Sequence, residues 1–364
     1  MAYSNIKDPS AHFQTVLYTG TGNANNAITN DGNSNMQPDF IWFKSRDAGH
    51  SHYVVDSSRG RDKGLYPDGV NSEVTSSGST TDCQSFDTDG FTVGTPEDAN
   101  STNSSSSTKV AWQWKANGGT TSSNTSGTIT TTVQANTDAG FSIVTWAGNA
   151  SNATMGHGLG ATPKVIISKA LGTTNDWNVY HRDVDATAPY NYLLNLHTTG
   201  ARSAATGSWG TSLSHINSTT FYKKYWINYN TNMIAYAFAE KQGFSKFGKY
   251  VGNGSGTSDG TFDGTFVYTG FSPSFLMIKR SDGGVEDWNM FDNKRQTYNY
   301  NQKKLYANQS AAESGNVYDA VDFLSNGFKI RTGRGGTNTS GGTYMYMAFA
   351  ENPFVAGGIP TTAR

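Results

Sequence analysis

The chain has 364 residues, of which 15% are charged and 13% are aromatic, and its formal net charge at neutral pH is −1. Such a sparse and balanced charge gives no field that would attract nucleic acid or an anionic membrane, and no apolar run reaches transmembrane length. The single cysteine excludes an intrachain disulfide, and 41 glycines indicate short elements joined by turns.

One sequence pattern occurs three times. In each copy a proline opens a mostly apolar, strand-favouring run, and a lysine follows six positions after the proline. The copies are Pro38 to Lys44, Pro163 to Lys169 and Pro273 to Lys279. A proline at the first position of a strand removes no ladder hydrogen bond that is needed, and a run that is apolar on both faces is typical of a strand buried on both sides. Each copy therefore predicts a central strand.

Motifs on both sides of this pattern extend each copy to about 95 residues. An aromatic residue, a spacer and a glycine precede it, a short strand segment follows it, and a second aromatic strand closes it. The closing aromatic residues are Trp114, Phe238 and Phe349. The repeat predicts that these three residues are equivalent, and that Lys44, Lys169 and Lys279 are equivalent.

Abundant Tyr, Phe, Trp and Thr favour strands, and Asp-Gly or Asn-Gly turns recur in segments 86–93 and 323–330. The chain is therefore predicted to be all-β, with three tandem antiparallel β-sandwich modules of jelly-roll-like form. The expected order is an N-terminal arm (1–12), module 1 (13–116), a linker with a short strand (117–140), module 2 (141–240), module 3 (243–355) and a C-terminal tail (356–364).

Gly118 and Gly119 lie in a stretch rich in Gly, Thr, Ser and Asn, which is the composition of a flexible tether. Modules 2 and 3 follow each other almost directly. We therefore expect a hinge near residue 120 and a rigid pair formed by modules 2 and 3.

Few residues suggest catalysis. A retaining glycosidase needs two carboxylates facing one cleft, whereas the glutamates of this chain lie far apart in the sequence. Asp56, His181 and Asp292 share one position of the repeat, where capping a strand end is the expected role. The chain is therefore predicted not to be an enzyme.

Metal binding and cysteine chemistry are also not expected. His50 and His52 could share one strand face, but no third ligand accompanies them, so neither a metal nor another cofactor is predicted. Cys83 lies in a Ser- and Thr-rich loop and is expected to carry no function. The basic and aromatic segment 221–226 is interpreted as an amphipathic strand with its lysines on the solvent face.

Aromatic residues in Asn- and Thr-rich loops are candidate contacts for a glycan or a partner protein. A ring can stack on a sugar while a neighbouring amide binds its hydroxyl groups. The candidates are Tyr190, Tyr192, Trp209, Tyr298 and Tyr300. The same side chains could instead cover the protein's own core or a subunit interface, and both interpretations stay open.

Four stretches carry a resemblance to a known group of proteins. They are Asp8 to Thr15, Trp112 to Gly119, Gly243 to Gly254 and Ala348 to Phe354. With them the chain, from about residue 8 to residue 355, resembles an uncharacterised tandem-repeat family of marine bacteriophage virion proteins, usually labelled tail fibre or structural protein. The resemblance implies concanavalin A-like or laminin G-like sandwich modules. That family has no established catalytic motif, so no site residue follows from it.

The resemblance implies a virion structural protein, either a tail fibre or another surface appendage that mediates attachment or assembly. Its partners would be other virion proteins and a host surface glycan. The alternatives are a carbohydrate-binding or carbohydrate-cleaving adsorption protein, and a capsid decoration or head fibre protein. A homotrimer is expected by analogy with phage fibres. The first residues lack an apolar signal core, so we expect synthesis in the host cytoplasm and a final place on the virion surface, with the N-terminal arm and module 1 docked on the particle.

Overall fold

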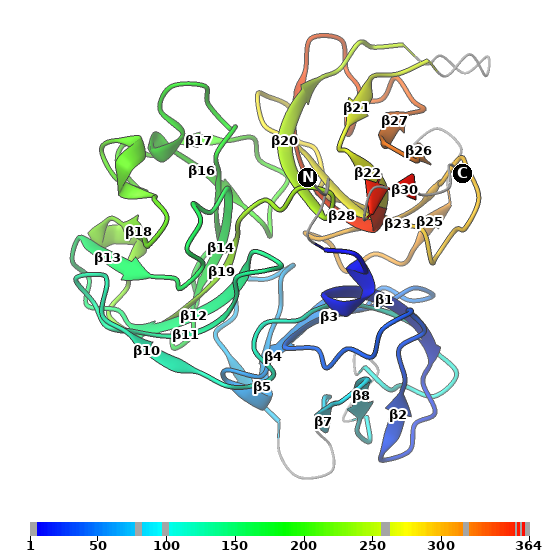
Figure 1. The fold of residues 1–364 in the computed structure, drawn as a ribbon, viewed down its shortest axis with the longest axis horizontal. Coiled ribbons are helices and arrows are strands. Elements are labelled where there is room, and N and C mark those ends of the chain that lie inside the picture. Colours follow the sequence, from blue (N-terminus) through cyan, green and yellow to red (C-terminus); the bar gives the residue numbers. More distant parts are fainter. Residues whose placement is uncertain are drawn as a thin grey trace.

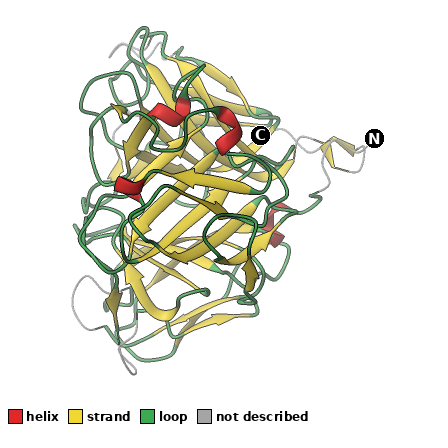
Figure 2. Ribbon diagram, turned by 90° about the vertical axis from the view of Figure 1, so that its left-hand side faces the viewer, coloured by secondary structure: helices red, strands yellow, loops and turns green. Residues whose placement is uncertain are grey.

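The computed structural model describes residues 6–76, 82–96, 102–255, 263–315, 320–353, 355–356 and 359–360. The first five residues of the expected N-terminal arm and most of the expected C-terminal tail lie outside the described residues. The prediction of an all-β chain is confirmed, because strands dominate and the helical structure of the described residues consists of short 3-10 turns (Figure 2). Those turns are η1 (Pro9–Ala11), η3 (Pro189–Asn191), η4 (Leu213–His215) and η5 (Tyr225–Ile227). Among the described residues, no helix has the length and apolar character needed to cross a membrane.

The first large sheet, called sheet I, is built from residues of the N-terminal third of the chain. In order across the sheet its strands are β1 (Phe13–Thr19), β9 (Thr108–Trp114), β3 (Phe40–Ser45), β4 (Tyr53–Asp56), β5 (Gly60–Leu65) and β6 (Val74–Thr75). A small sheet accompanies it, formed by β2 (Asn26–Ile28), β8 (Gly90–Val93) and β7 (Ser85–Asp87). Strands β7 and β8 are the predicted hairpin, with Asp87 opposite Gly90. Gly90 has a φ of 106°, and a Cβ there would lie 2.0 Å from the Ile28 carbonyl oxygen, so the turn requires glycine.

Sheet II is formed by the middle of the chain. Its strands are β10 (Ser122–Asn124), β11 (Thr131–Asn136), β12 (Phe141–Ala147), β19 (Asn232–Phe238), β14 (Val165–Ala170), β15 (Asn178–His181), β16 (Tyr192–Asn195) and β17 (Ser203–Ala204). Its small sheet pairs β13 (Ala153–Gly156) with β18 (Thr220–Lys223). Strands β10 and β11 come from the segment that the sequence suggests as a linker, and they extend the edge of this sheet.

Sheet III is formed by the C-terminal part. Its strands are β20 (Ser245–Val251), β28 (Thr343–Pro353), β22 (Phe271–Arg280), β23 (Asn289–Asp292), β24 (Lys303–Tyr306) and β25 (Ser314–Gly315). Its small sheet contains β21 (Phe266–Tyr268), β27 (Gly327–Ile330) and β26 (Val321–Leu324), and a separate pair joins β29 (Val355–Ala356) to β30 (Ile359–Pro360).

The three large sheets share one strand order. The runs β1-β9-β3-β4, β12-β19-β14-β15 and β20-β28-β22-β23 follow the same path through the chain. The registers confirm the predicted alignment: the closing aromatics Trp114, Phe238 and Phe349 pair with Phe40, Val165 and Phe275, which are the first apolar residues of the three copies. The lysines align in the same way, since Lys44, Lys169 and Lys279 pair with Val110, Ile234 and Met345.

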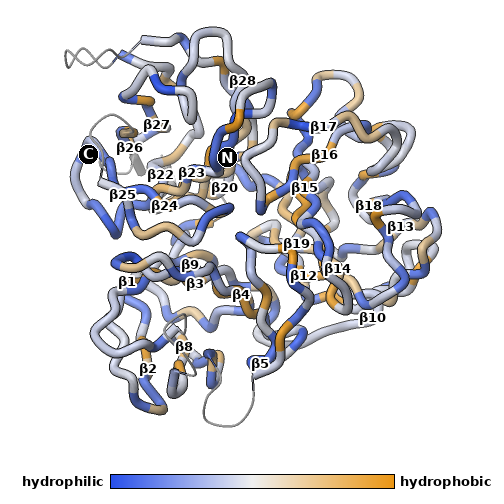
Figure 3. The backbone as a smooth tube through the Cα atoms, turned by 180° about the vertical axis from the view of Figure 1, so that it is seen from behind, coloured by the Kyte–Doolittle hydropathy of each residue, from blue (hydrophilic) through white to orange (hydrophobic). Residues whose placement is uncertain are grey.

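The central strands are buried on both faces, as their apolar runs predict. In β3 every residue is buried, and alternate side chains belong to two different clusters. Phe40 and Trp42 point into the core shared by the three sheets, whereas Ile41 and Phe43 pack toward Phe91 of the small sheet. Figure 3 shows that hydrophobic stretches fall on the strands, while peripheral loops are mostly hydrophilic or neutral.

The inner faces of the three large sheets meet at a common centre (Figure 1). The rings of Trp114, Phe238 and Phe349 form a triangle there, with centroid separations of 6.3 Å, 5.5 Å and 6.0 Å for the three pairs. These distances lie within the range of favourable edge-to-face contacts. One aromatic from each copy of the repeat thus joins all three sheets.

The expected hinge near residue 120 is wrong. The backbone N–H groups of Gly118 and Gly119 donate hydrogen bonds of 2.9 Å and 2.8 Å to the carboxylate of Asp39, which lies next to β3. Sheets I and II also share one core with sheet III. The composition of the segment around Gly118 predicted a flexible tether. The buried carboxylate of Asp39 accepts hydrogen bonds from two backbone amides of this segment and holds the segment in place.

Residues 6–12 of the expected arm are packed as well. Ile6 belongs to the shared core, and the Asp8 carboxylate accepts a hydrogen bond of 3.0 Å from the Ser10 amide at the start of η1. The sequence shows no core pattern here because a single apolar residue has no periodicity.

Candidate functional site

The contacts between the large sheets repeat in a cyclic way, and they use residues that the sequence singles out. We call the three contact regions junction I–II, junction II–III and junction III–I after the sheets that meet there. Each junction contains one lysine of the repeat, one ring before the fourth strand of one sheet, and one polar group at the end of the equivalent strand of the other sheet.

The three repeat lysines are buried and connect neighbouring sheets. Lys169 of sheet II donates to the carbonyl of Val70 in the sheet I segment, at 2.9 Å. Lys279 of sheet III donates to Thr199 of the sheet II segment at 2.7 Å, and Lys44 of sheet I donates to Ser310 of the sheet III segment at 3.0 Å. In all three cases burial lowers the lysine pKa to about 8. The sequence predicted their equivalence but gave no reason to expect that they join sheets.

A ring before the fourth strand of each run makes a second contact. Trp177 and Trp288 donate from Nε1 to the carbonyls of Tyr66 and Asn195, at 2.9 Å and 3.0 Å. His52 takes the same place in sheet I: its Nε2 donates to the Tyr306 carbonyl at 2.8 Å.

The His52 ring is fixed on both sides. Its Nδ1 accepts a hydrogen bond of 2.7 Å from Trp42, so Nε2 carries the proton that is donated to Tyr306. Burial holds the His52 pKa well below its usual value. Both ring nitrogens of His52 are thus engaged in hydrogen bonds, so neither is available to share a metal ion with His50. In the part of the chain that the structure describes, no three His, Cys, Asp or Glu side chains come together as metal ligands.

The aligned residues Asp56, His181 and Asp292 do cap strand ends, but they also bind the neighbouring sheet. The Asp56 carboxylate accepts from the Arg59 amide at 2.9 Å and from the Tyr236 hydroxyl of sheet II at 2.8 Å. Asp292 accepts from the Arg295 amide at 2.8 Å and from Trp112 Nε1 of sheet I at 3.0 Å.

His181 completes this set at junction II–III. Its Nδ1 accepts from the Asp183 amide at 3.2 Å, and its Nε2 donates to the Tyr346 carbonyl at 3.3 Å. Burial lowers the pKa of His181 to about 4. The polar groups that looked most suited to chemistry are thus engaged in joining sheets.

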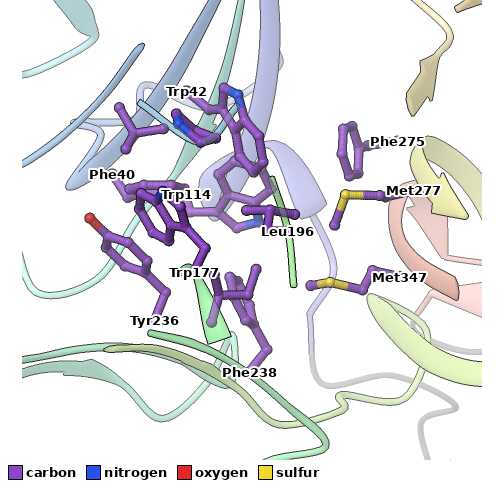
Figure 4. A pocket seen from close by; sticks show the side chains of 13 residues that line it. Phe40, Trp42, Trp114, Trp177, Leu196, Tyr236, Phe238, Phe275, Met277 and Met347 are labelled. Atoms are coloured by element: carbon purple, nitrogen blue, oxygen red, sulfur yellow. The ribbon is translucent and has the colours of Figure 1, made fainter. Parts of the chain in front are cut away.

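A cavity of about 20 Å³ lies where the three sheets meet. Figure 4 shows its lining side chains converging from all three sheets, among them Phe40 and Trp114 of sheet I, Tyr236 of sheet II and Met277 of sheet III. A space of this size holds about one water molecule, and its walls are aromatic and aliphatic. It is a packing defect of the shared core and not a ligand site.

The predicted contact residue Trp209 is buried, which corrects its expected exposure. It lies in the core of sheet II beside Tyr180, and the ammonium of Lys223 lies 5.5 Å from its ring centroid. Lys223 is also buried, donates to Ser168 Oγ at 2.6 Å, and has its pKa lowered to about 7 by burial. The prediction that the lysines of segment 221–226 face solvent is therefore wrong for Lys223, which points inward. Lys224 is partly exposed.

The four predicted tyrosines divide into two pairs. Tyr190 packs against the sheet II core, and the guanidinium of Arg202 lies 4.3 Å from the ring of Tyr192, so both rings have protein neighbours. Tyr298 is 82% exposed and Tyr300 is 39% exposed, in the loop between β23 and β24. Of the five candidates, Tyr298 and Tyr300 are the exposed ones, whereas Tyr190 and Tyr192 are half-buried.

Other exposed aromatic residues were missed by the sequence analysis. Tyr225 and Trp226 lie on η5 at the edge of the sheet II segment, and Phe266 and Tyr268 lie on β21. The exposure of Phe266 and Tyr268 could have been predicted from the alternation of side chains along a strand. Val267, which lies between them, points to the buried face, so its two neighbours point to solvent.

Cys83 is fully buried in the cluster between sheet I and its small sheet. Its thiol contacts the Ser85 carbonyl oxygen at 3.5 Å, and burial raises its pKa. A buried thiol with a raised pKa is unreactive. Cys83 lies in the loop before β7, as predicted, and its side chain packs into the core.

Three open pockets with polar walls lie outside the central core. One of about 280 Å³ lies at junction III–I, one of about 370 Å³ lies beside β11 and β12, and one of about 430 Å³ lies beside β23 and β24. The first and the second each combine residues of two sheets, and two residues that line the first carry buried polar atoms without a described partner.

Comparison with known proteins gives one match. A family model described as a domain of unknown function, DUF7483, matches residues 8–353. The chain belongs to this family. The match spans all three large sheets, in keeping with the core that they share. No curated protein and no solved structure matches the chain.

Proposed function

We propose that the protein is a non-enzymatic structural protein of the bacteriophage particle surface, as a tail fibre or another appendage for attachment or assembly. The observation that carries the proposal is the cyclic set of contacts that joins three sheets of equal strand order into one body. The buried lysines, the aligned Asp and His residues, and the central aromatics all serve this joining. The proposed location on a particle is supported by the resemblance of the four stretches to virion proteins.

The proposal includes a finer description of the fold. Each large sheet with its small sheet is treated as one sandwich module of jelly-roll-like form, so that the chain is a tandem array of three. The two separate clusters on either face of β3 support this description for the first module.

Particle association can be tested directly. Purified virions labelled with an antibody against this chain should show it at the tail or at another surface site under the electron microscope, and mass spectrometry should detect it in the same particles. Its absence from virions would remove the proposal. Labelling of the capsid alone would favour a head fibre or decoration protein.

Oligomeric state stays a prediction. Identical chains often associate to hide apolar surface by symmetric closure, yet here three sheets of one chain already cover each other's apolar faces. The homotrimer now depends on the analogy with phage fibres alone. Light scattering of the purified chain that shows only monomer would count against it.

A second candidate function is glycan binding during host adsorption, and the exposure of Tyr298 and Tyr300 favours it. The buried Asp56 and Asp292 form ion pairs with Arg59 and Arg295, at 2.6 Å and 2.5 Å, so binding is proposed and cleavage is not. The double variant Tyr298→Ala with Tyr300→Ala should reduce adsorption of particles to host cells. Tyr225→Ala, which removes another exposed ring, is the control. Unchanged adsorption in the double variant would leave these tyrosines as ordinary loop residues.

A further inference from the structure

The pocket at junction III–I is built from both sheets. On one side lie β1 and the loop 31–33 of the sheet I segment, and on the other side lie Ser274 at β22 and the residues that follow β23. Its volume is about 280 Å³, close to the lower end of the range for small-molecule sites. Buried Phe13 and Ala350 provide apolar floor, and the walls are hydroxyl and amide groups.

The wall along β1 is held in place by hydrogen bonds. Gln14 donates from Nε2 to the carbonyls of Ser10 and Ser34, both at 2.9 Å, and its Oε1 accepts from the Gly32 amide at 2.9 Å. One side chain therefore ties η1 and the loop 31–34 to the strand. The pocket is formed before any ligand arrives, which lowers the entropy cost of binding.

Two buried polar atoms in the pocket have no hydrogen-bond partner among the described residues. They are the hydroxyl oxygen of Thr15 and the amide oxygen of Asn293, and each residue is only 4% exposed. A buried polar group without a partner costs free energy, and native structures contain few of them. Together they offer one acceptor and one group that can donate or accept.

The charges around the pocket cancel. Lys294 Nζ lies 2.8 Å from both carboxylate oxygens of Asp31, so one charge from each sheet forms a partly exposed ion pair. A charged ligand would have to compete with this pair, whereas a neutral ligand would not. The pocket therefore suits a neutral polar molecule.

Junction I–II shows which chemical group fits the corresponding place. Asn293 corresponds to Ser57, because the backbone amide of each donates to the residue just before Phe275 or Phe40, the first apolar residue of its copy. Thr15 corresponds to Ile143 by strand register. At junction I–II the side chain of Gln134 lies between the two corresponding residues, Ser57 and Ile143. Gln134 pairs with Ile143 in the sheet, and its amide nitrogen donates to Ser57 Oγ at 3.0 Å. Its Oε1 also accepts from the amides at the start of the former linker. The chain itself thus fills the equivalent position with a neutral carboxamide.

We propose that the pocket at junction III–I binds a neutral saccharide unit that carries an amide, such as an N-acetylhexosamine. Both atoms are covered in this structure, so the Thr15 and Asn293 side chains must rotate toward the pocket when the ligand binds. A sugar hydroxyl or the amide N–H can then donate to Asn293 Oδ1, and Thr15 Oγ1 can bind a second hydroxyl. The apolar floor accommodates the acetyl methyl group or the C–H face of the ring. The inference names a second, separate sugar contact for the glycan-binding candidate function, and it does not depend on the position of the protein in a particle.

The test is a titration of the full chain with N-acetylglucosamine, followed by saturation-transfer NMR and calorimetry. Wild type should bind with a millimolar dissociation constant, and glucose, which lacks the amide, should bind more weakly. Thr15→Val keeps the shape of the side chain and removes the unpartnered hydroxyl, so the fold should persist while binding weakens by about tenfold. Asn293→Ala should weaken it similarly.

Thr337→Val is the matched control, because Thr337 is also buried with an unpartnered hydroxyl but lies outside the pocket. Its affinity for N-acetylglucosamine should equal that of wild type. Failure of wild type to bind N-acetylglucosamine overturns the proposal. Equal binding by wild type and Thr15→Val also overturns it, as does loss of binding only in the variant that lacks Tyr298 and Tyr300. Absence of the chain from virions would remove the proposed function and leave this result unaffected.

Discussion

Junctions I–II and III–I join sheets with the same strand order, yet they differ in what lies beyond the first strand of the shared order, β12 in one sheet and β1 in the other. At junction I–II the extra edge strand β11 supplies Gln134, whose carboxamide binds Ser57 and Ser58 at 3.0 Å and 2.9 Å. At junction III–I, β1 is the edge of its sheet, and the corresponding place is an open pocket. The added strand β11 therefore fills a place at junction I–II that is open at junction III–I. A separate pocket of about 370 Å³, lined by Arg59 and Glu73 of the sheet I segment and by β11 and β12, leaves junction I–II open elsewhere.

The parts that both junctions share are those of the repeat. Each has a buried lysine that donates to a carbonyl of the neighbouring sheet, and each has an aspartate that accepts from a ring or hydroxyl of the neighbouring sheet. The two junctions differ in the ring, which is His52 at junction III–I and Trp177 at junction I–II, and in the edge strand β11, which only junction I–II has. Joining and binding are therefore separable by mutation.

The largest expected effect comes from the ring that touches both junctions at the centre. Phe349 is 1% exposed and contacts Trp114 and Phe238, so Phe349→Ala should lower the free energy of unfolding by about 3–5 kcal/mol. Chemical denaturation measures the change. A loss below about 0.5 kcal/mol, the size usual for surface sites, would contradict the shared core.

The buried lysines should give both junctions the same pH response. A pKa of about 8 in the folded chain, against 10.5 normally, means that the unfolded chain binds more protons between these values. The contribution of each lysine to stability therefore increases as pH rises from about 8 to about 10.5, by at most about 3 kcal/mol at 1.36 kcal/mol for each pKa unit.

Lys169→Met and Lys44→Met should each remove one such increase from the pH dependence of the unfolding free energy. Denaturation curves at about pH 7 and about pH 10 would measure it. If the unfolding free energy of either variant still rose with pH as in the wild type, the lysine replaced in that variant would be hydrated and not buried. The two junctions would then differ in the environment of their lysines.

Gln134→Ala should affect junction I–II alone. It leaves the Asn117 and Gly119 amides and the Ser57 hydroxyl with fewer partners, so we expect a loss of about 1–3 kcal/mol in unfolding free energy. Binding of N-acetylglucosamine should be unchanged because the pocket at junction III–I keeps its walls. Reduced sugar binding in this variant would show that the two junctions are coupled.

The smallest effect is expected outside both junctions. Tyr298→Ala removes an exposed ring and should change the unfolding free energy by less than about 0.5 kcal/mol. A larger change, measured under the conditions used for Phe349→Ala, would mean that this loop covers a surface between sheets.

The amino-acid pattern was enough to predict the all-β class, the central strands, their alignment and the equivalence of Lys44 with Lys169 and Lys279. These features are local: a proline, an apolar run and a lysine at fixed spacing fix how one strand lies in its sheet. The sequence also predicted that Asp56 and Asp292 cap strand ends, because a cap binds amides only a few residues away.

The groups that those residues join could not be predicted before the fold was known. The partners of the lysines are backbone carbonyls, which every residue has, so no sequence pattern identifies Val70, Thr199 or Ser310 as acceptors. Tyr236 and Asp56 are 180 residues apart, and their contact exists only once two sheets have docked. The burial of Trp209 and the fixed position of Gly118 likewise follow from packing against distant segments, because a loop composition describes the local chain and not what covers it.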